Sequence, residues 1–197
     1  MNFKYILSVI FLSCLFITNP GSQKEECLSV PPGGIPGFWY SVSKLKRNKV
    51  DNEHYYCASS GCLAVISKYI DINEVYKIAL ISKKYNGSFS EIKNNFISLI
   101  INELEFIPNI TIVTMTKYGT CIERSVNDKR QLKTLLIKTT DIPLLVNTNG
   151  EVDGGPCYYY MNRCKRNIRL PLTYKFIINT LNNDLTIDDL DYFYNYI

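Results

Sequence analysis

The chain contains a single histidine, His54, and this scarcity excludes much of the chemistry that depends on imidazole. A zinc site built from several histidines is excluded, and a Ser-His-Asp triad would have to use His54 itself. A strong charge of one sign is also missing, because 22 Lys and Arg against 18 Asp and Glu give a net charge of only +4. Nucleic-acid binders gather basic residues into patches, whereas these are scattered, so no nucleic-acid partner is predicted.

Long apolar runs are absent apart from one near the start. Tyr5 to Thr18 is uncharged and apolar, Lys4 precedes it, and small or turn-forming residues follow at 19–22. The run is shorter than the roughly 20 residues of a transmembrane helix and is typical of a secretory signal. We therefore predict a signal peptide over residues 1–22, a single domain over 23–197, and a protein that is secreted or lies in the endomembrane lumen. The alternatives are an uncleaved signal that anchors the chain in a membrane, and an internal helix.

The cysteines and two short tripeptides fit an exported chain. Six cysteines remain after Cys14 of the predicted signal, and an even number in an oxidising compartment permits three disulfides. Their spacing does not decide the pairs, and buried thiols are the alternative. Asn86-Gly87-Ser88 and Asn109-Ile110-Thr111 match the N-glycosylation sequon, which matters only in a secretory pathway.

Strand-like and helix-like segments alternate along the chain. This alternation predicts layered α/β structure with a largely parallel sheet. The predicted strands cover residues 27–30, 54–57, 110–116 and 121–126, and the predicted helices cover 38–47, 62–69, 71–85, 90–104 and 129–138. Further segments are an apolar run over 143–146, a strand over 174–178 and a closing helix over 187–194.

The first candidate motif is Gly33-Gly34-Ile35-Pro36-Gly37, between a predicted strand and a predicted helix. Glycines let backbone N–H groups come close to a ligand, and a helix N-terminus attracts negative charge. The loop can therefore hold an anion, or it can simply turn the chain. The dinucleotide-binding pattern G-x-G-x-x-G does not fit it, and the Lys-[Ser/Thr] of a P-loop is missing.

Two further motifs contain a candidate nucleophile and a candidate base. Cys57-Ala58-Ser59-Ser60-Gly61 matches the serine elbow G-x-S-x-G at the serine and the last glycine, with Cys57 at the first position. Ser59 occupies the nucleophile position, although a serine here could also be the N-cap of a helix. Asp153-Gly154-Gly155 follows 94 residues after Ser59, and by itself it predicts a turn.

Taken in order, the glycine loop, the serine elbow and the distant Asp-Gly-Gly resemble the patatin-like phospholipase family. The resemblance is to its shorter, adiponutrin-type members and covers roughly Leu28 to Gly155. It implies a three-layer α/β/α fold with a mainly parallel central sheet. It also implies that Ser59 is the nucleophile, that Asp153 accepts its proton, and that Gly33 and Gly34 form the oxyanion hole.

The function implied by the resemblance is that of a serine acyl hydrolase that cleaves fatty-acyl esters of lipids or phospholipids, at a membrane surface. A Ser-Asp dyad needs neither a metal nor an organic cofactor, so we expect none. His54 lies five residues before Ser59 on the same predicted strand, where a packed or exposed side chain is the simpler interpretation. The alternative function is that of an inactive patatin-fold protein that binds lipid or membrane. The sequence gives no indication of the oligomeric state.

Overall fold

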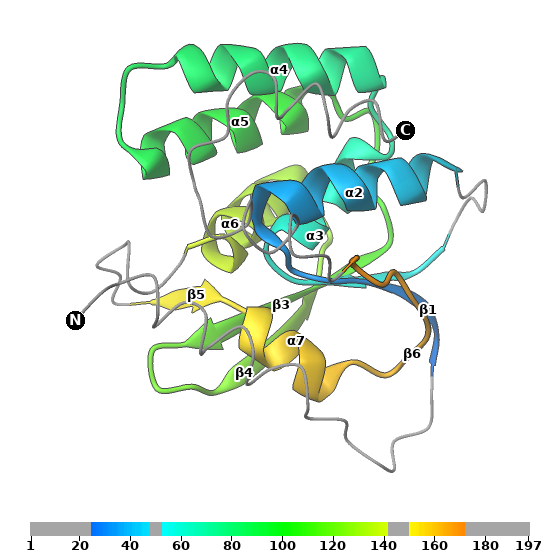
Figure 1. Cartoon of the computed structure of the whole chain (residues 1–197). Helices are drawn as coiled ribbons and strands as arrows, with labels where there is room; N and C mark the ends of the chain where they lie inside the picture. The colour runs from blue at the N-terminus through cyan, green and yellow to red at the C-terminus, as the bar shows by residue number, and fades with distance from the viewer. Residues whose placement is uncertain (1–24, 48–52, 142–149, 172–197) are drawn as a thin grey trace.

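The computed structural model describes residues 25–47, 53–141 and 150–171, which form a mixed α/β structure with a mostly parallel sheet (Figure 1). The predicted signal peptide and the segments predicted over 143–146, 174–178 and 187–194 lie outside the described residues. The strands are β1 (Glu25–Val30), β2 (Tyr55–Cys57), β3 (Ile110–Thr116), β4 (Cys121–Ser125), β5 (Glu151–Asp153) and β6 (Cys164–Asn167). The helices are α2 (Gly34–Arg47), α3 (Ser60–Ser67), α4 (Ile72–Lys84), α5 (Phe89–Glu103), α6 (Lys129–Thr139) and α7 (Gly155–Met161).

The sheet has the strand order β4-β3-β2-β1-β6, and β5 also pairs with β3. Strands β6, β1, β2 and β3 run parallel to one another, while β4 and β5 run antiparallel to β3. Strand β2 pairs with the first half of β3 and β5 pairs with its second half, whereas β4 pairs along most of its length. Hence β2 and β5 share one edge of β3 and approach each other head to head.

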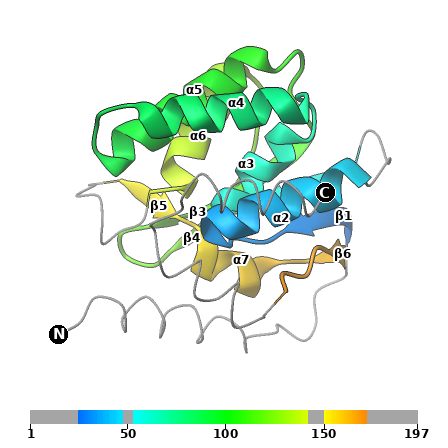
Figure 2. The same cartoon turned by 45° about the horizontal axis from the view of Figure 1, so that its top comes forward.

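Alternating side chains divide the core between the two faces of the sheet, as the twofold period of a strand requires. On one face Val30, Cys57 and Ile112 pack against residues of α2 to α6 in the main hydrophobic core. On the other face Ala58 and Val113 belong to a smaller cluster that includes two residues of α7. Figure 2 shows the same division, with α7 apart from the other helices. Helices therefore cover both faces.

Local signals account for most element ends. Asp71 caps α4 by accepting hydrogen bonds from the N–H groups of Asn73 and Glu74. A capping box between Ser88 and Glu91 starts α5. The prediction that a helix begins at Phe38 was wrong by one turn, since α2 starts at Gly34. Proline is accommodated in the first turn of a helix, where its missing N–H costs no intrahelical hydrogen bond.

Three disulfides pair the six cysteines of the described residues. Cys27–Cys164 joins the neighbouring strands β1 and β6, and Cys121–Cys157 joins β4 to α7. Cys57–Cys62 joins the end of β2 to the first turn of α3. The alternative of buried thiols is therefore wrong for these six residues. In the part of the chain that the structure describes, no helix combines the length and the apolar character needed to cross a bilayer.

Candidate active site

Ser59 lies on a sharp turn between β2 and α3. Its φ of 52° and ψ of −135° make it the only non-glycine residue with positive φ among the described residues. Such a conformation costs on the order of 1–3 kcal/mol and persists only where the surroundings enforce it. The enforcing contacts are found in three places around the turn.

The first contact comes from the end of α6. The Ser59 N–H donates a hydrogen bond to Thr139 Oγ1 at 2.9 Å, and the Thr139 hydroxyl donates in turn to the carbonyl of Val113 at 2.6 Å. Thr139 is fully buried. One threonine thus connects the backbone of the turn to the centre of β3, although it stands 80 residues away in the sequence.

The second and third constraints come from residues close to Ser59 in the sequence. Gly61 lies against the end of β1, where a Cβ atom would come within 2.6 Å of the carbonyl oxygen of Pro31. The disulfide between Cys57 and Cys62 closes a covalent loop around Ser59. Cys57, at the first position of the elbow, therefore helps to hold the turn through its disulfide with Cys62.

The pairing of β3 brings Asp153 to Ser59. Cys57 at the end of β2 pairs with Ile112, and Asp153 at the end of β5 pairs with Thr114, so the two strand ends meet over Val113. Gly154 permits this approach, since a Cβ atom there would lie 2.8 Å from the backbone nitrogen of Thr114 and closer still to Val113. The first glycine of Asp-Gly-Gly is thus required by packing against β3.

Ser59 and Asp153 are in direct contact. Ser59 Oγ donates a hydrogen bond to Asp153 Oδ2 at 2.7 Å, and the Gly155 N–H donates to Asp153 Oδ1 at 2.7 Å. Burial raises the pKa of Asp153 to about 6, while the hydrogen bonds from Ser59 and Gly155 act in the opposite direction. The carboxyl group therefore changes its protonation state in a range that suits a proton acceptor near neutral pH.

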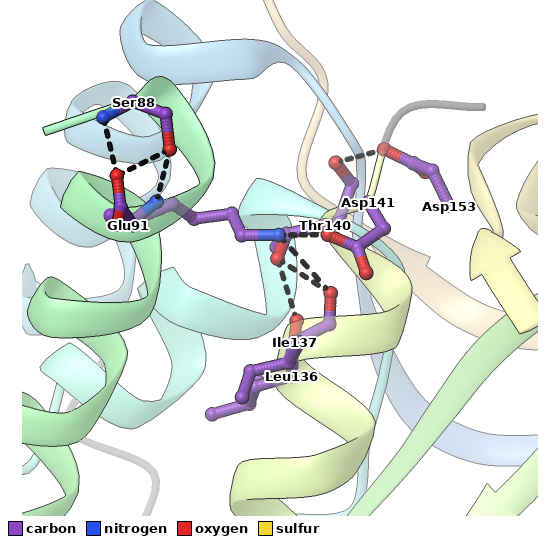
Figure 3. A network of polar contacts seen from close by, with 9 residues as sticks. Ser88, Glu91, Leu136, Ile137, Thr140, Asp141 and Asp153 are labelled. Atoms are coloured by element: carbon purple, nitrogen blue, oxygen red, sulfur yellow. Dashed lines mark hydrogen bonds and ion pairs between the residues drawn. The ribbon is translucent and has the colours of Figure 1, made fainter. Parts of the chain in front are cut away.

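A cation and a second carboxylate lie behind this pair. The Asp153 N–H donates to the carbonyl of Asp141 at 2.9 Å, and Figure 3 shows the two aspartates joined by this bond. The Asp141 carboxylate is paired with Lys93 of α5, whose ammonium also donates to the carbonyl of Ile137 at 3.4 Å. Lys93 lowers the pKa of Asp153 and Asp141 raises it, so their charges partly cancel.

The glycine loop lies beside Ser59, but its two glycines differ. The Gly33 N–H donates to Ser60 Oγ at 3.0 Å and is therefore already engaged. Gly34 has a φ of 61°, opens α2 and lines the same cavity as Ser59, as does Ile35. The first N–H groups of a helix have no partner within the helix, and Pro36 has none to offer. Gly34 and Ile35 are thus the better placed donors for an anion, and Ile35 was not predicted.

The cavity in front of Ser59 has a volume of about 300 Å³, near the lower end of the range for ligand pockets. Its wall is mainly apolar and comes from α2, α3, α4 and α5. The large apolar side chains that line it are Ile35, Phe38, Trp39, Leu63, Phe89, Ile92 and Phe96. A space of this kind suits a hydrocarbon chain that ends at the Ser59 hydroxyl.

The single histidine lies away from this arrangement. The ring of His54, just before β2, contacts the hydroxyl of Thr111 at 2.9 Å, while Ser59 follows the other end of that strand. In the part of the chain described, one group of possible metal ligands stands out, made by Glu25, Cys27 and His54. Cys27 is bonded to Cys164, so its sulfur is not available as a thiolate ligand.

No protein-family model matches the chain, and no curated protein matches it significantly.

Proposed function

We propose that the protein is a serine acyl hydrolase of the patatin-like phospholipase type, with the three-layer fold of that family, and that it cleaves fatty-acyl esters of lipids. The observation that carries the proposal is the 2.7 Å hydrogen bond from Ser59, on a turn with positive φ, to Asp153. The apolar cavity that begins at Ser59 supports a lipid acyl chain as substrate. The three disulfides support a secreted or lumenal location, because such bonds form and persist in oxidising compartments.

The proposed reaction begins when Asp153 Oδ2 accepts the Ser59 hydroxyl proton and Oγ attacks the ester carbonyl carbon. The N–H groups of Gly34 and Ile35, with the positive end of α2, stabilise the resulting oxyanion. The C–O bond to the leaving group breaks, and the leaving alcohol takes the proton from Asp153. Water then attacks the acyl carbon while Asp153 accepts a proton from it, the bond between Ser59 Oγ and the acyl carbon breaks, and Asp153 returns the proton to Oγ as the fatty acid leaves.

A fluorophosphonate probe tests the proposal directly, because it reacts with an activated serine and forms a stable adduct. We expect the wild-type protein to be labelled at Ser59 and the Ser59→Ala variant to lose labelling. Ser125→Ala is the matched control, since Ser125 is an exposed serine at the end of β4. If a folded wild-type protein is not labelled, the hydrolase is excluded and non-catalytic lipid binding becomes the leading function.

The rate of labelling should depend on pH through Asp153. Since only the ionised carboxylate can accept the Ser59 proton, the rate should rise about tenfold per pH unit below pH 6 and level off above it. Measuring the rate constant from pH 4.5 to 8 tests this. The single histidine lies at the other end of β2 from Ser59, so His54→Gln is the control and should keep the profile unchanged. A profile that disappears with His54→Gln would contradict the role of Asp153 as the proton acceptor.

A further inference from the structure

The α4–α5 hairpin ends in an unusual surface. In Figures 1 and 2 the two helices lie side by side, and Figure 1 shows α4 as the helix farther from the sheet. Their connection, with the last turn of α4 and the first residue of α5, covers residues 81–89, which we call the hairpin tip. Every residue of the tip except Ser82 is exposed.

Large apolar side chains gather at the tip. Ile81 is 57% exposed, Tyr85 is 50% exposed and Phe89 is 47% exposed, and these are half of the six exposed large hydrophobic side chains of the described residues. Ile81 and Tyr85 stand four residues apart, so they point from the same side of the end of α4. Single exposed apolar residues are common, but three within nine residues indicate a surface for a partner.

The charge at the tip favours an anionic partner. Lys83 and Lys84 are neighbours in the last turn of α4, and both are exposed. The acidic residue nearest to the tip in the sequence is Glu91, and its carboxylate accepts hydrogen bonds from Ser88 in the capping box. Apolar and aromatic side chains beside lysines are the combination that binds the interface of a bilayer with anionic headgroups.

The cavity extends to this surface. Lys83 and Phe89 belong to the tip, are exposed and also line the cavity, so the cavity and the tip share two residues. A lipid that leaves a bilayer at the tip would therefore enter the cavity without crossing water. A folded protein partner at the same place would close the route to Ser59, which makes the bilayer the better fit.

We propose that the hairpin tip docks the protein on an anionic lipid bilayer and holds the mouth of the cavity against it. This inference rests on the proposed function, because it assumes that the cavity takes lipid. It assigns to Ile81 and Tyr85 the apolar contact with the membrane interface, and to Lys84 an electrostatic contact with the headgroups.

Sedimentation with vesicles tests the docking surface. The full chain is produced without N-glycans, since Asn86 of the tip lies in a sequon, and is mixed with vesicles of phosphatidylcholine alone or with 30% phosphatidylserine. We expect tighter binding to the anionic vesicles, lost in about 0.5 M salt. Ile81→Ser/Tyr85→Ser should weaken binding about tenfold or more, and Lys84→Gln about fivefold.

A matched control removes two exposed aromatic side chains elsewhere. Tyr118, in the β3–β4 turn, is 85% exposed and Tyr160 on α7 is 54% exposed, so Tyr118→Ser/Tyr160→Ser should bind as the wild type does. Equal loss in the control and tip variants, or equal binding to both kinds of vesicle, would overturn the proposal. So would a wild-type dimer that binds no vesicle and becomes a monomer with Ile81→Ser/Tyr85→Ser, since a second copy would then cover the tip.

Labelling by a water-soluble fluorophosphonate separates this inference from the proposed function. Neither Ile81 nor Tyr85 lines the cavity, so their double variant should be labelled in solution at the wild-type rate. Labelling without vesicle binding would overturn the docking surface and leave the hydrolase intact. Vesicle binding through the tip without labelling would support the docking surface and overturn the hydrolase.

Discussion

Replacing Asp153 with asparagine is expected to slow acylation of Ser59 by about 10³–10⁴-fold, because an amide cannot accept the hydroxyl proton. Asparagine has the shape of aspartate, so its side-chain oxygen can still accept the Gly155 N–H that now bonds to Oδ1. The rate constant of fluorophosphonate labelling for Asp153→Asn against wild type measures the effect. A decrease smaller than tenfold would show that Asp153 is not the proton acceptor.

Stability measurements separate this loss of rate from misfolding. Because burial raises the pKa of Asp153 to about 6, ionising it in the folded protein is unfavourable. The neutral carboxyl group therefore contributes to the stability of the folded protein. This contribution is fully present below the ordinary pKa near 4 and is lost as the pH rises through 6. Asp153→Asn should therefore be at least as stable as wild type at pH 7. Asp128→Asn is the matched control, since Asp128 accepts the Gln131 N–H at the exposed start of α6 and asparagine caps equally well.

Replacing Gly154 with alanine is expected to lower the free energy of unfolding by about 3 kcal/mol, at the upper end of the usual cost of overpacking. The φ of −84° at Gly154 suits any residue, so the effect is steric. The new methyl group would lie 2.8 Å from the Thr114 nitrogen and closer still to Val113, and these are backbone atoms in the middle of the sheet. We expect a melting temperature about 10 °C lower, measured by thermal unfolding with circular dichroism.

Gly150→Ala is the matched control for that substitution. Gly150 precedes β5 by one residue, and a Cβ atom there would meet no other atom within 4 Å. Its alanine variant should unfold within about 0.5 kcal/mol of wild type. Equal stability of the two variants would contradict the close packing of Asp-Gly-Gly against β3.

The sequence predicted the parts of the fold that local patterns encode. Alternating β-branched residues indicated β3, and Asp71 marked the start of α4 at the residue where the structure has its N-cap. Helix α7 and the strands β5 and β6 were missed. Their stability depends on distant partners, since Tyr158 packs in the small cluster behind the sheet and Cys164 is bonded to Cys27 of β1.

The candidate site was predictable only where residues stand in short motifs. Ser59 and Asp153 could be singled out because each belongs to a recognisable tripeptide or pentapeptide, and the structure places them in contact. Their catalytic roles remain predictions. Thr139 and Lys93 carry no such signal, since each is a polar residue on a helix with many exposed neighbours. Only the packing of α5 and α6 against the turn brings them to the site.

Because Cys57 and Cys62 form a disulfide, the conformation of the turn at Ser59 depends on whether these two cysteines are oxidised. A newly synthesised chain in a reducing compartment carries two thiols there, and its turn is then held by noncovalent contacts alone. Closing a loop by a disulfide restricts the unfolded chain and favours the arrangement that the bond fits. The turn at Ser59 is therefore held by all of its constraints only after this pair is oxidised, and a reduced chain would keep only the noncovalent ones.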